Sequence, residues 1–223
     1  VTNDESTQIS YYLSYNHIQF VLDIGANKGQ FAKSVLKKNS SFKILSVEPI
    51  KSCHKELLKE SKNIKNWIIY KREVAISDST SIKEFHITRS DHSSSLLHPI
   101  NSGNLDQRIL KAHEVIKEQQ IKTITIKQLI EETEIDPSST CLKLDIQGME
   151  FKVIKSVMAD KIRFKNIIIE ASLEPLYYGE KSFENLKEIL FKNDYKIDII
   201  RSSLVSEKNF KTLQINVCFS LIE

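Results

Sequence analysis

The chain has 223 residues, of which 27% are charged and 40% hydrophobic; these values are typical of globular proteins and exclude a disordered chain. Its net charge of +3, from 32 basic and 29 acidic residues, is too small to predict a nucleic-acid-binding surface. No apolar run is long enough to span a bilayer, so the sequence predicts one α/β domain with a sizeable core and no membrane span.

Three cysteines, Cys53, Cys141 and Cys218, lie far apart and form no CxxC pair. We predict buried free thiols, and the lack of a disulfide framework favours a reducing compartment and a cytoplasmic location. No Cys and His residues lie at zinc-ligand spacing, so no metal is predicted. The polar segment at 1–10 is unlike a secretory signal, and a chain that begins at Val1 suggests processing or excision from something longer.

The predicted elements alternate between strands and helices. In chain order they are a helical lead-in at 1–19, a strand at 20–22, a helix at 30–38, a strand at 43–47, a helix that ends near 62, a third strand made of 67–70 and 74–76, and an extra strand at 80–88 beside it. After an irregular loop at 89–105 come a strand at 121–126, a helix at 127–132, a strand at 140–146, a helix from 148 to about 158, a strand at 166–170, a helix at 183–191, and strands at 195–200 and 212–221 that we expect to pair antiparallel.

Repeated strand–helix units of this kind predict a mostly parallel, doubly wound sheet. We expect residues 1–19 to cap the sheet or cover a cofactor, and residues 20–223 to form a single domain. Within that domain, residues 80–126 would be an insertion that supplies a substrate loop.

The first strand, a glycine turn and the next helix form the arrangement of a nucleotide pocket. Asn27 stands where a dinucleotide fingerprint has its second glycine, and its side chain would crowd a pyrophosphate, which disfavours an NAD-dependent oxidoreductase. Asp23 suits a cation such as an α-ammonium. Glu48, after the second strand, can accept hydrogen bonds from ribose hydroxyls, although a carboxylate there also favours the next helix N-terminus. A nucleoside with an amino-acid tail and no phosphate is S-adenosylmethionine, which we predict as the cofactor.

Several sequence segments occur in the order typical of one family. They are VLDIGANKGQFA at 21–32, SVEP at 46–49, VAISD at 74–78, SSL at 94–96, LKLDIQGME at 142–150, IIIEASLEPLYYGE at 167–180 and LQINVCFSL at 213–221. The chain resembles the FkbM-type family of S-adenosylmethionine-dependent methyltransferases over about residues 20–221. Gln147 and Tyr178 depart from the family pattern, which often has Glu and an acid at these positions.

The resemblance implies a class I methyltransferase fold: a Rossmann-like, seven-stranded, mostly parallel sheet with helices on both faces and one antiparallel strand. It also implies methyl transfer, commonly to a hydroxyl of a sugar or natural product. By the same resemblance, the cofactor-binding residues would be Asp23, Gly25, Ala26, Asn27 and Gly29 at the methionine end, Glu48 and Pro49 at the ribose, Ala75, Ile76 and Asp78 at the adenine, and Asp145 at the sulfonium and the acceptor.

Methylation of an aliphatic hydroxyl needs a general base, because the free alcohol is a poor nucleophile. Asp145 is the first candidate because it ends a core strand at the carboxyl edge of the sheet, and Glu170 ends the next strand and could share the role. His92 is a third candidate, although a solvated loop histidine is the common alternative. Asp145 and Glu170 are conceivable metal ligands, but no His/Asp cluster supports a metal. Glu150 is expected to close a helix start.

The remaining histidines carry less signal, and we expect His54 and His113 on helix surfaces. Three functions stay open: an O-methyltransferase acting on a sugar, glycan or small natural product, a nucleic-acid methyltransferase, and a catalytically silent binding module. The near-neutral charge disfavours the second. The expected partner is a small-molecule or glycan acceptor, with no nucleic acid, and a homo-oligomer is left open. No segment gives a readable code for the acceptor.

Overall fold

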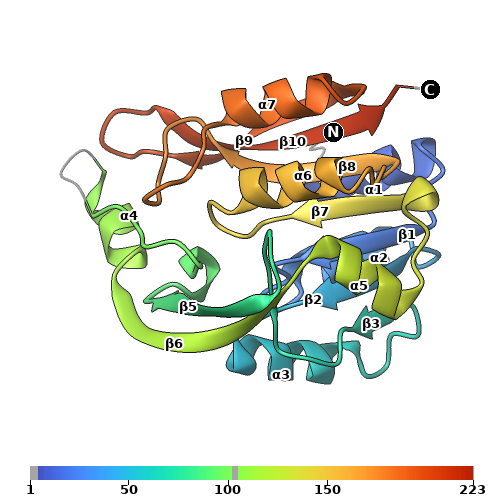
Figure 1. The fold of residues 1–223 in the computed structure, drawn as a ribbon, viewed down its shortest axis with the longest axis horizontal. Helices are drawn as coiled ribbons and strands as arrows, with labels where there is room; N and C mark the ends of the chain where they lie inside the picture. The colour runs from blue at the N-terminus through green and yellow to red at the C-terminus, as the bar shows by residue number, and fades with distance from the viewer. Residues whose placement is uncertain (1–4, 102–104, 223) are drawn as a thin grey trace.

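The computed structural model describes residues 5–101 and 105–222, which fold around a central seven-stranded sheet of order β3-β2-β1-β7-β8-β10-β9 (Figure 1). The strands are β1 (Phe20–Ile24), β2 (Lys43–Val47), β3 (Trp67–Ile69), β7 (Thr140–Leu144), β8 (Asn166–Ser172), β9 (Tyr195–Val205) and β10 (Thr212–Leu221). β1, β2, β3, β7 and β8 pair in parallel, while β10 runs antiparallel to both β8 and β9. The predicted class I methyltransferase fold, including the antiparallel final pair, is confirmed.

Helices cover both faces of this sheet, as Figure 1 shows for α5, α6 and α7 in front. The bounds are α1 (Glu5–Tyr15), α2 (Gln30–Lys38) and α3 (Lys51–Ser61), followed by α5 (Ile126–Thr133), α6 (Glu150–Ala159) and α7 (Phe183–Phe191). Successive side chains of a strand point to opposite faces. Val21 therefore packs in the apolar cluster that holds α1 and α2, whereas Leu22 packs in the cluster that holds α5, α6 and α7.

A second, three-stranded sheet of order β4-β6-β5 lies beside the carboxyl ends of the central strands (Figure 1). It consists of β4 (Ala75–Ile76), β5 (Ser81–Thr88) and β6 (Val115–Ile124). The prediction of one third strand from 67–70 and 74–76 was wrong, because β3 pairs in the central sheet and β4 pairs with β6. The strand at 80–88 does not lie beside β4 either, since β6 separates them.

The strand predicted at 121–126 corresponds to β6, which begins earlier, at Val115, and ends sooner, at Ile124. β6 starts at Val115 because its polar first half pairs antiparallel with β5, a partner that periodicity does not show. It ends before Thr125, whose side-chain oxygen accepts a hydrogen bond from the backbone N–H of Gln128 and caps α5.

The irregular loop predicted at 89–105 contains a short 3₁₀ turn, η1 (Asp91–Ser93), and is followed by α4 (Gln107–Ala112). The part of that prediction at 102–104 lies outside the described residues, as do residues 1–4 of the predicted lead-in. α1 occupies residues 5–15 of the lead-in, and its Tyr12 hydroxyl accepts a hydrogen bond from Asn166 of β8 and donates to Asp198 of β9. This pairing ties α1 to the sheet. The boundaries of the lead-in and the insertion stay predictions.

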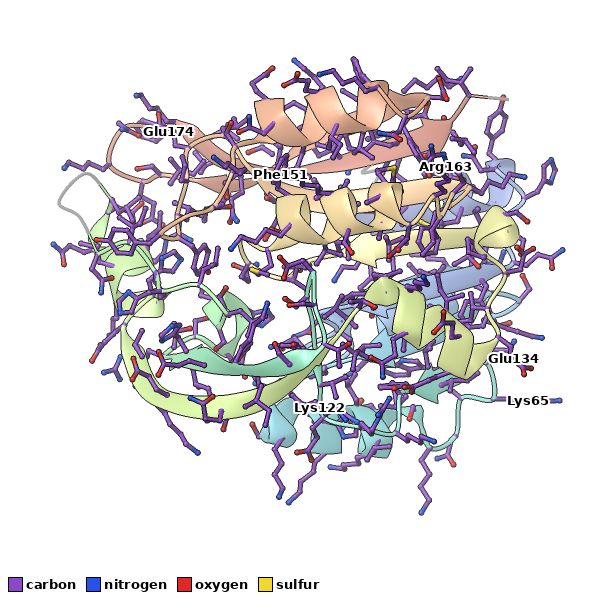
Figure 2. The ribbon with its side chains drawn as sticks, viewed as in Figure 1. Lys65, Lys122, Glu134, Phe151, Arg163 and Glu174 are labelled. Atoms are coloured by element: carbon purple, nitrogen blue, oxygen red, sulfur yellow. The ribbon has the colours of Figure 1, made fainter. Side chains whose placement is uncertain are left out.

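Charged side chains lie over the outside of the molecule, as Lys65 and Lys122 illustrate (Figure 2). Cys53, Cys141 and Cys218 are buried, as predicted, and the structure joins none of them in a disulfide. Within residues 5–101 and 105–222, every helix is too short or too polar to cross a bilayer.

Candidate functional site

Three cavities adjoin at the carboxyl ends of β1, β7 and β8. The first lies between the turn after β1, the start of α3 and β4; the second, about 450 Å³, lies against α1 and α2; the third, about 210 Å³, lies between α4 and the β9–β10 hairpin. Among the described residues, only His92 and Asp145 line all three cavities. Groups bound in different cavities would therefore meet beside His92 and Asp145.

The turn after β1 separates the first cavity from the second, and Gly25 and Asn27 line both. Gly25 has φ of +75°, and a Cβ there would lie 1.8 Å from the backbone oxygen of Asp145, so only glycine fits. Ala26 is buried and lines the second cavity. Gly29 lines none of the three; it starts α2 at φ of +81°, where a Cβ would meet the Trp67 ring at 2.3 Å. A glycine is needed at this position because the start of α2 packs closely against Trp67.

Asp23 is fully buried and lines none of the three cavities. Its carboxylate lies 3.2 Å from the Lys143 ammonium and accepts a hydrogen bond from the Ser46 hydroxyl at 3.1 Å. The cationic partner of Asp23 in the structure is thus a side chain of this chain, and its contact with the α-ammonium of a ligand stays a prediction. Burial opposes the charge of Lys143, but Asp23 and Asp145 outweigh it and hold the Lys143 pKa above its ordinary value.

Lys143 was missed by sequence reasoning and lines the second cavity. Its position follows from the register of the sheet, since β7 places it opposite Asp23 of β1. The alternation of LKLDI indicated only that Lys143 and Asp145 share a face.

Glu48 and Pro49 line the first cavity, as the ribose assignment requires. Glu48 is almost fully buried, and its two oxygens accept hydrogen bonds from the backbone N–H groups of Asn27 and Ile50, each at 2.8 Å. Burial raises the pKa of this carboxyl to about 7, although the two backbone hydrogen bonds act in the opposite direction. Each oxygen keeps a lone pair for a further donor.

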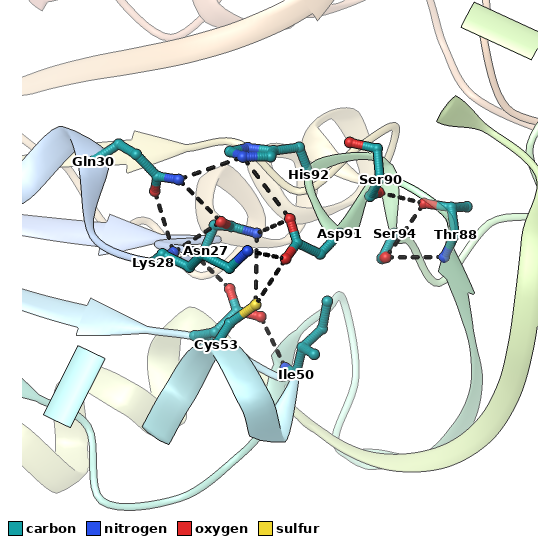
Figure 3. Close-up of polar contacts among 11 residues, drawn as sticks. Asn27, Lys28, Gln30, Ile50, Cys53, Thr88, Ser90, Asp91, His92 and Ser94 are labelled. Carbon is teal, nitrogen blue, oxygen red and sulfur yellow. Dashed lines mark hydrogen bonds and ion pairs between the residues drawn. The ribbon is translucent and has the colours of Figure 1, made fainter. Parts of the chain in front are cut away.

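Asp91 of η1 closes over the first cavity (Figure 3). Its carboxylate lies 2.6 Å from the Lys28 ammonium and accepts hydrogen bonds from the Asn27 amide at 3.3 Å and the Cys53 thiol at 3.6 Å. Beside it, Gln30 Nε2 lies 3.4 Å from His92 Nε2. With these contacts in place the first cavity has a free volume of about 50 Å³. Sequence reasoning missed Asp91 because an irregular loop gives no pattern for its fold.

The residues assigned to the adenine divide into two groups. Ala75 and Ile76 line the first cavity together with Val74 and Phe85. Asp78 does not; it lies 2.9 Å from the Lys83 ammonium and accepts a hydrogen bond from the Ser77 hydroxyl, outside all three cavities. The structure therefore places Asp78 away from the site.

Asp145 and Glu170 are brought together, as expected from their places at the ends of adjacent strands. Gln147 Nε2 donates to both carboxylates, at 2.7 Å to Asp145 Oδ1 and 2.9 Å to Glu170 Oε2. The Tyr177 hydroxyl lies 2.8 Å from Gln147 Oε1 and donates to it. Burial, with the charge of Asp145 as the second cause, raises the pKa of Glu170 to about 7.

Glu150 accepts hydrogen bonds from the backbone N–H groups of Ile146 and Gly148, at 2.7 and 2.8 Å. Its predicted role at a helix start is confirmed.

The prediction that two histidines lie on helix surfaces was wrong. His54 is buried with its Nε2 2.8 Å from the Tyr70 carbonyl oxygen, and His113 is buried against the Tyr177 ring. His92 is 60% exposed at the rim.

On the small sheet, Glu84, His86 and Glu118 bring three possible ligand atoms within 4.8 Å of one another. None of them lines the three cavities. Sequence spacing missed this group because Glu118 belongs to a different strand. The expectation that no metal takes part stays a prediction.

The side chains around the first cavity fit one type of nucleoside. Its lining contains the carboxylates of Glu48, Asp91 and Asp145 and no Lys or Arg. Such a lining disfavours a pyrophosphate and favours a positively charged group. A carboxylate for ribose hydroxyls, apolar walls and a glycine turn fit S-adenosylmethionine.

Comparisons with known proteins agree with this chemistry. A family model described as the methyltransferase FkbM domain matches residues 23–197. The fold is similar to an O-methyltransferase from Bacillus cereus solved in complex with SAH, at a TM-score of 0.55 and 9% identity, covering 99% of this chain and 82% of that one.

It is also similar to the methyltransferase domain of bacterial CtHen1, at a TM-score of 0.50 and 12% identity, covering 98% and 97% of the two chains. No curated protein matches the sequence significantly. At these identities the structural likeness shows the fold, and the match over residues 23–197 shows the family. The chain therefore belongs to the FkbM family of S-adenosylmethionine-dependent methyltransferases.

Proposed function

We propose that this methyltransferase acts on a hydroxyl of a sugar, glycan or small natural product. The observation that carries the proposal is the pair of carboxylates, Asp145 and Glu170, which Gln147 bridges by hydrogen bonds and which both line the second and third cavities. A carboxylate of this kind can take the proton of an alcohol. When bound, S-adenosylmethionine supplies a methyl group on a positively charged sulfur.

The chain's own residues would hold the cofactor in the first and second cavities. Glu48 would bind the ribose hydroxyls, and Ala75 and Ile76 would flank the adenine. The turn at Gly25 and Asn27 would hold the methionine end. Lys143, at the wall of the second cavity, would attract the methionine carboxylate.

Glu170 is the residue best suited to accept the proton. Its pKa of about 7 lies close to neutral pH, the condition under which a general base is most effective. The Asp145 side chain, which is 35% exposed and lies 3.5 Å from the Lys143 ammonium, would stabilise positive charge nearby. His92 lines the same junction, where it is an alternative base.

A nucleic-acid acceptor is the second candidate for this fold. The carboxylates of Glu48, Asp91 and Asp145 around the first cavity, and of Glu170 in the third, oppose a polyanion close to the reacting atoms. A binding module without catalysis would retain cofactor affinity and give no turnover with any acceptor.

The three buried cysteine thiols, which form no disulfide, support the proposal of a reducing, cytoplasmic location.

The cofactor assignment is tested by isothermal titration with S-adenosylhomocysteine. Wild-type protein should bind, and Glu48→Ala should bind about 10- to 100-fold more weakly, because charge-assisted hydrogen bonds contribute about 1.5–3 kcal/mol. Glu174→Gln, on an exposed side chain, is the matched control and should bind like wild type. Equal affinity in Glu48→Ala would refute the ribose role, and no binding to wild type would refute the cofactor site.

A separate experiment distinguishes binding from catalysis. Asp145→Asn should retain affinity for S-adenosylhomocysteine and lower turnover by about 10²- to 10³-fold, the cost of removing a group that stabilises charge at the reacting centre. Turnover is followed as S-adenosylhomocysteine release across a panel of hydroxyl acceptors. Unchanged turnover in Asp145→Asn would remove this residue from the mechanism.

A further inference from the structure

Tyr177, in the loop after β8, lies beside the three cavities but lines none of them. Its side chain is fully buried, and its backbone N–H donates to Glu180 at 3.1 Å. The ring lies against the His113 ring, with centroids 5.3 Å apart, and against Gly148, where an added Cβ would lie 3.2 Å from a ring carbon. Packing on these sides fixes the place of the Tyr177 hydroxyl, which reaches the site only through its neighbours.

The Tyr177 hydroxyl faces two acceptors and has one proton to donate. Its oxygen lies 2.8 Å from Gln147 Oε1 and 2.9 Å from the backbone carbonyl oxygen of Ser93 in η1. A carbonyl oxygen only accepts, so the two contacts compete for a single O–H. Ser93 is partly exposed at the wall of the third cavity, where solvent can supply a donor. Gln147 Oε1 has no other donor in the described part of the chain.

The orientation of the Gln147 amide decides whether it stabilises the two carboxylates. Its Nε2 donates to Asp145 Oδ1 at 2.7 Å and to Glu170 Oε2 at 2.9 Å, which uses both of its N–H groups. The opposite orientation would place an amide oxygen against two carboxylates, where the electrostatic interaction is repulsive. A donor on the Oε1 side is therefore what selects the favourable orientation, and Tyr177 is that donor.

We propose that Tyr177 is a positioning residue whose hydroxyl, by donating to Gln147 Oε1, keeps both N–H groups of this amide on Asp145 and Glu170. This inference rests on the proposed function. It adds a residue that acts on the proton acceptor through Gln147 and contacts neither cofactor nor acceptor. The second contact, with Ser93, joins η1 to the same hydroxyl, so the segment that closes over the first cavity and the carboxylate pair share one hydrogen-bond donor.

The test measures the pKa of Glu170 in Tyr177→Phe, which keeps the buried ring and removes the hydroxyl. A hydrogen bond to the ionised carboxylate lowers its pKa, and the bond from Gln147 acts in this direction on Glu170. Without the hydroxyl this bond weakens, so the pKa of Glu170 should rise by about 0.5 to 1. Carbon-13 NMR of protein labelled at the glutamate carboxyl carbons follows the titration, and Glu170→Gln identifies the signal. The other groups that face Glu170 stay in place in this variant: Asp145, Lys143 and Ser203.

Tyr195→Phe is the matched control. Tyr195 is also buried, and its hydroxyl donates to a backbone carbonyl oxygen, that of Phe164, at 2.7 Å. This variant loses a buried hydrogen bond of the same kind away from the site, so it should lose similar stability and leave the pKa of Glu170 unchanged. Gln147→Leu should raise that pKa at least as much as Tyr177→Phe does. Tyr177→Phe added to Gln147→Leu should raise it little further, because Tyr177 acts through Gln147.

Turnover gives a second measurement. With an acceptor that wild type methylates, Tyr177→Phe should lower kcat about threefold to tenfold and keep the affinity for S-adenosylhomocysteine, whereas Tyr195→Phe should keep both.

Two results would overturn the inference: a wild-type pKa of Glu170 in Tyr177→Phe, or an undiminished rise when Tyr177→Phe is added to Gln147→Leu. Failure of the proposed function is a different result, since it is read from S-adenosylhomocysteine binding and from turnover with hydroxyl acceptors. The titration of Glu170 needs neither cofactor nor acceptor and tests the role of Tyr177 in that case as well.

Discussion

Gln147 bridges two carboxylates with a single amide group. Asp145 and Glu170 are both half-buried, and the Lys143 ammonium lies 3.5 Å from the Asp145 carboxylate. Gln147 itself has φ of +54°, an unfavourable backbone conformation for glutamine that contacts with neighbouring residues must hold. Strain of this kind is common at functional sites, and the same residue donates hydrogen bonds to both carboxylates.

At this scale the pH dependence of turnover tests the role of Glu170. A general base must be unprotonated, so kcat at saturating cofactor should rise with pH around about 7, the pKa that burial and Asp145 give to Glu170, and level off above it. Glu170→Gln should remove this rise and lower kcat by about 10²-fold or more. A rise near pH 7 that persists in Glu170→Gln would assign the titration to another group, with His92 the next to test.

Among the elements, the β1–α2 turn has the strictest steric requirement. The turn brings Gly25 against the backbone that follows β7, and Gly29 against Trp67 of β3. Both glycines therefore fix how the turn sits on neighbouring strands. The cofactor end of the site depends on this placement, because Gly25 and Asn27 line two cavities.

Gly25→Ala and Gly179→Ala form a matched pair that separates steric contact from backbone strain. Both residues have positive φ, +75° and +80°, but an added Cβ meets Asp145 at 1.8 Å in the first and open space in the second. Gly179→Ala should cost about 1–2 kcal/mol of unfolding free energy, the cost of the left-handed conformation. Gly25→Ala should cost more than about 3 kcal/mol. Urea unfolding measures both, and equal losses would contradict the contact.

In the whole molecule, buried carboxyls concentrate around the site. Burial raises the pKa of Glu48 and Glu170 to about 7 and of Glu150 to about 8, and it also raises that of Glu180. Glu150 and Glu180 both hold backbone N–H groups of the loops that frame the carboxyl ends of the strands. Buried carboxyls therefore hold these loops in place, in addition to the catalytic role proposed for Glu170.

These raised pKa values predict how stability changes with pH. Between pH 4.5, the ordinary pKa of Glu, and about 8, folded Glu150 keeps a proton that the unfolded chain releases, so the unfolding free energy falls as pH rises. The loss from Glu150 is at most about 5 kcal/mol. Urea unfolding from pH 5 to 8 should show a shallower decline in Glu150→Gln. Glu184→Gln, on an exposed side chain of α7, is the control, and identical slopes in wild type and Glu150→Gln would contradict the prediction.

The sequence alone determined the alternation of strands and helices, the final antiparallel pair and the cofactor type. Helix and strand periodicity is local, so α7 at Phe183–Phe191 and β10 at Thr212–Leu221 were predicted with their bounds. The presence of Asn27 in place of the second glycine is also read directly from the sequence, and it disfavoured a cofactor with a pyrophosphate. The pairing of Asp145 with Glu170 followed because adjacent parallel strands end at one edge.

The tertiary structure decided which side chains meet across the site. Asp91 reaches Asn27 from 64 residues away, and the Lys143 ammonium meets Asp23 through the register of two strands. His113 follows α4, where a surface position was expected, yet α4 and the β9–β10 hairpin enclose it in the third cavity. Contacts between distant segments depend on how whole elements pack, and local sequence patterns carry no information about that packing.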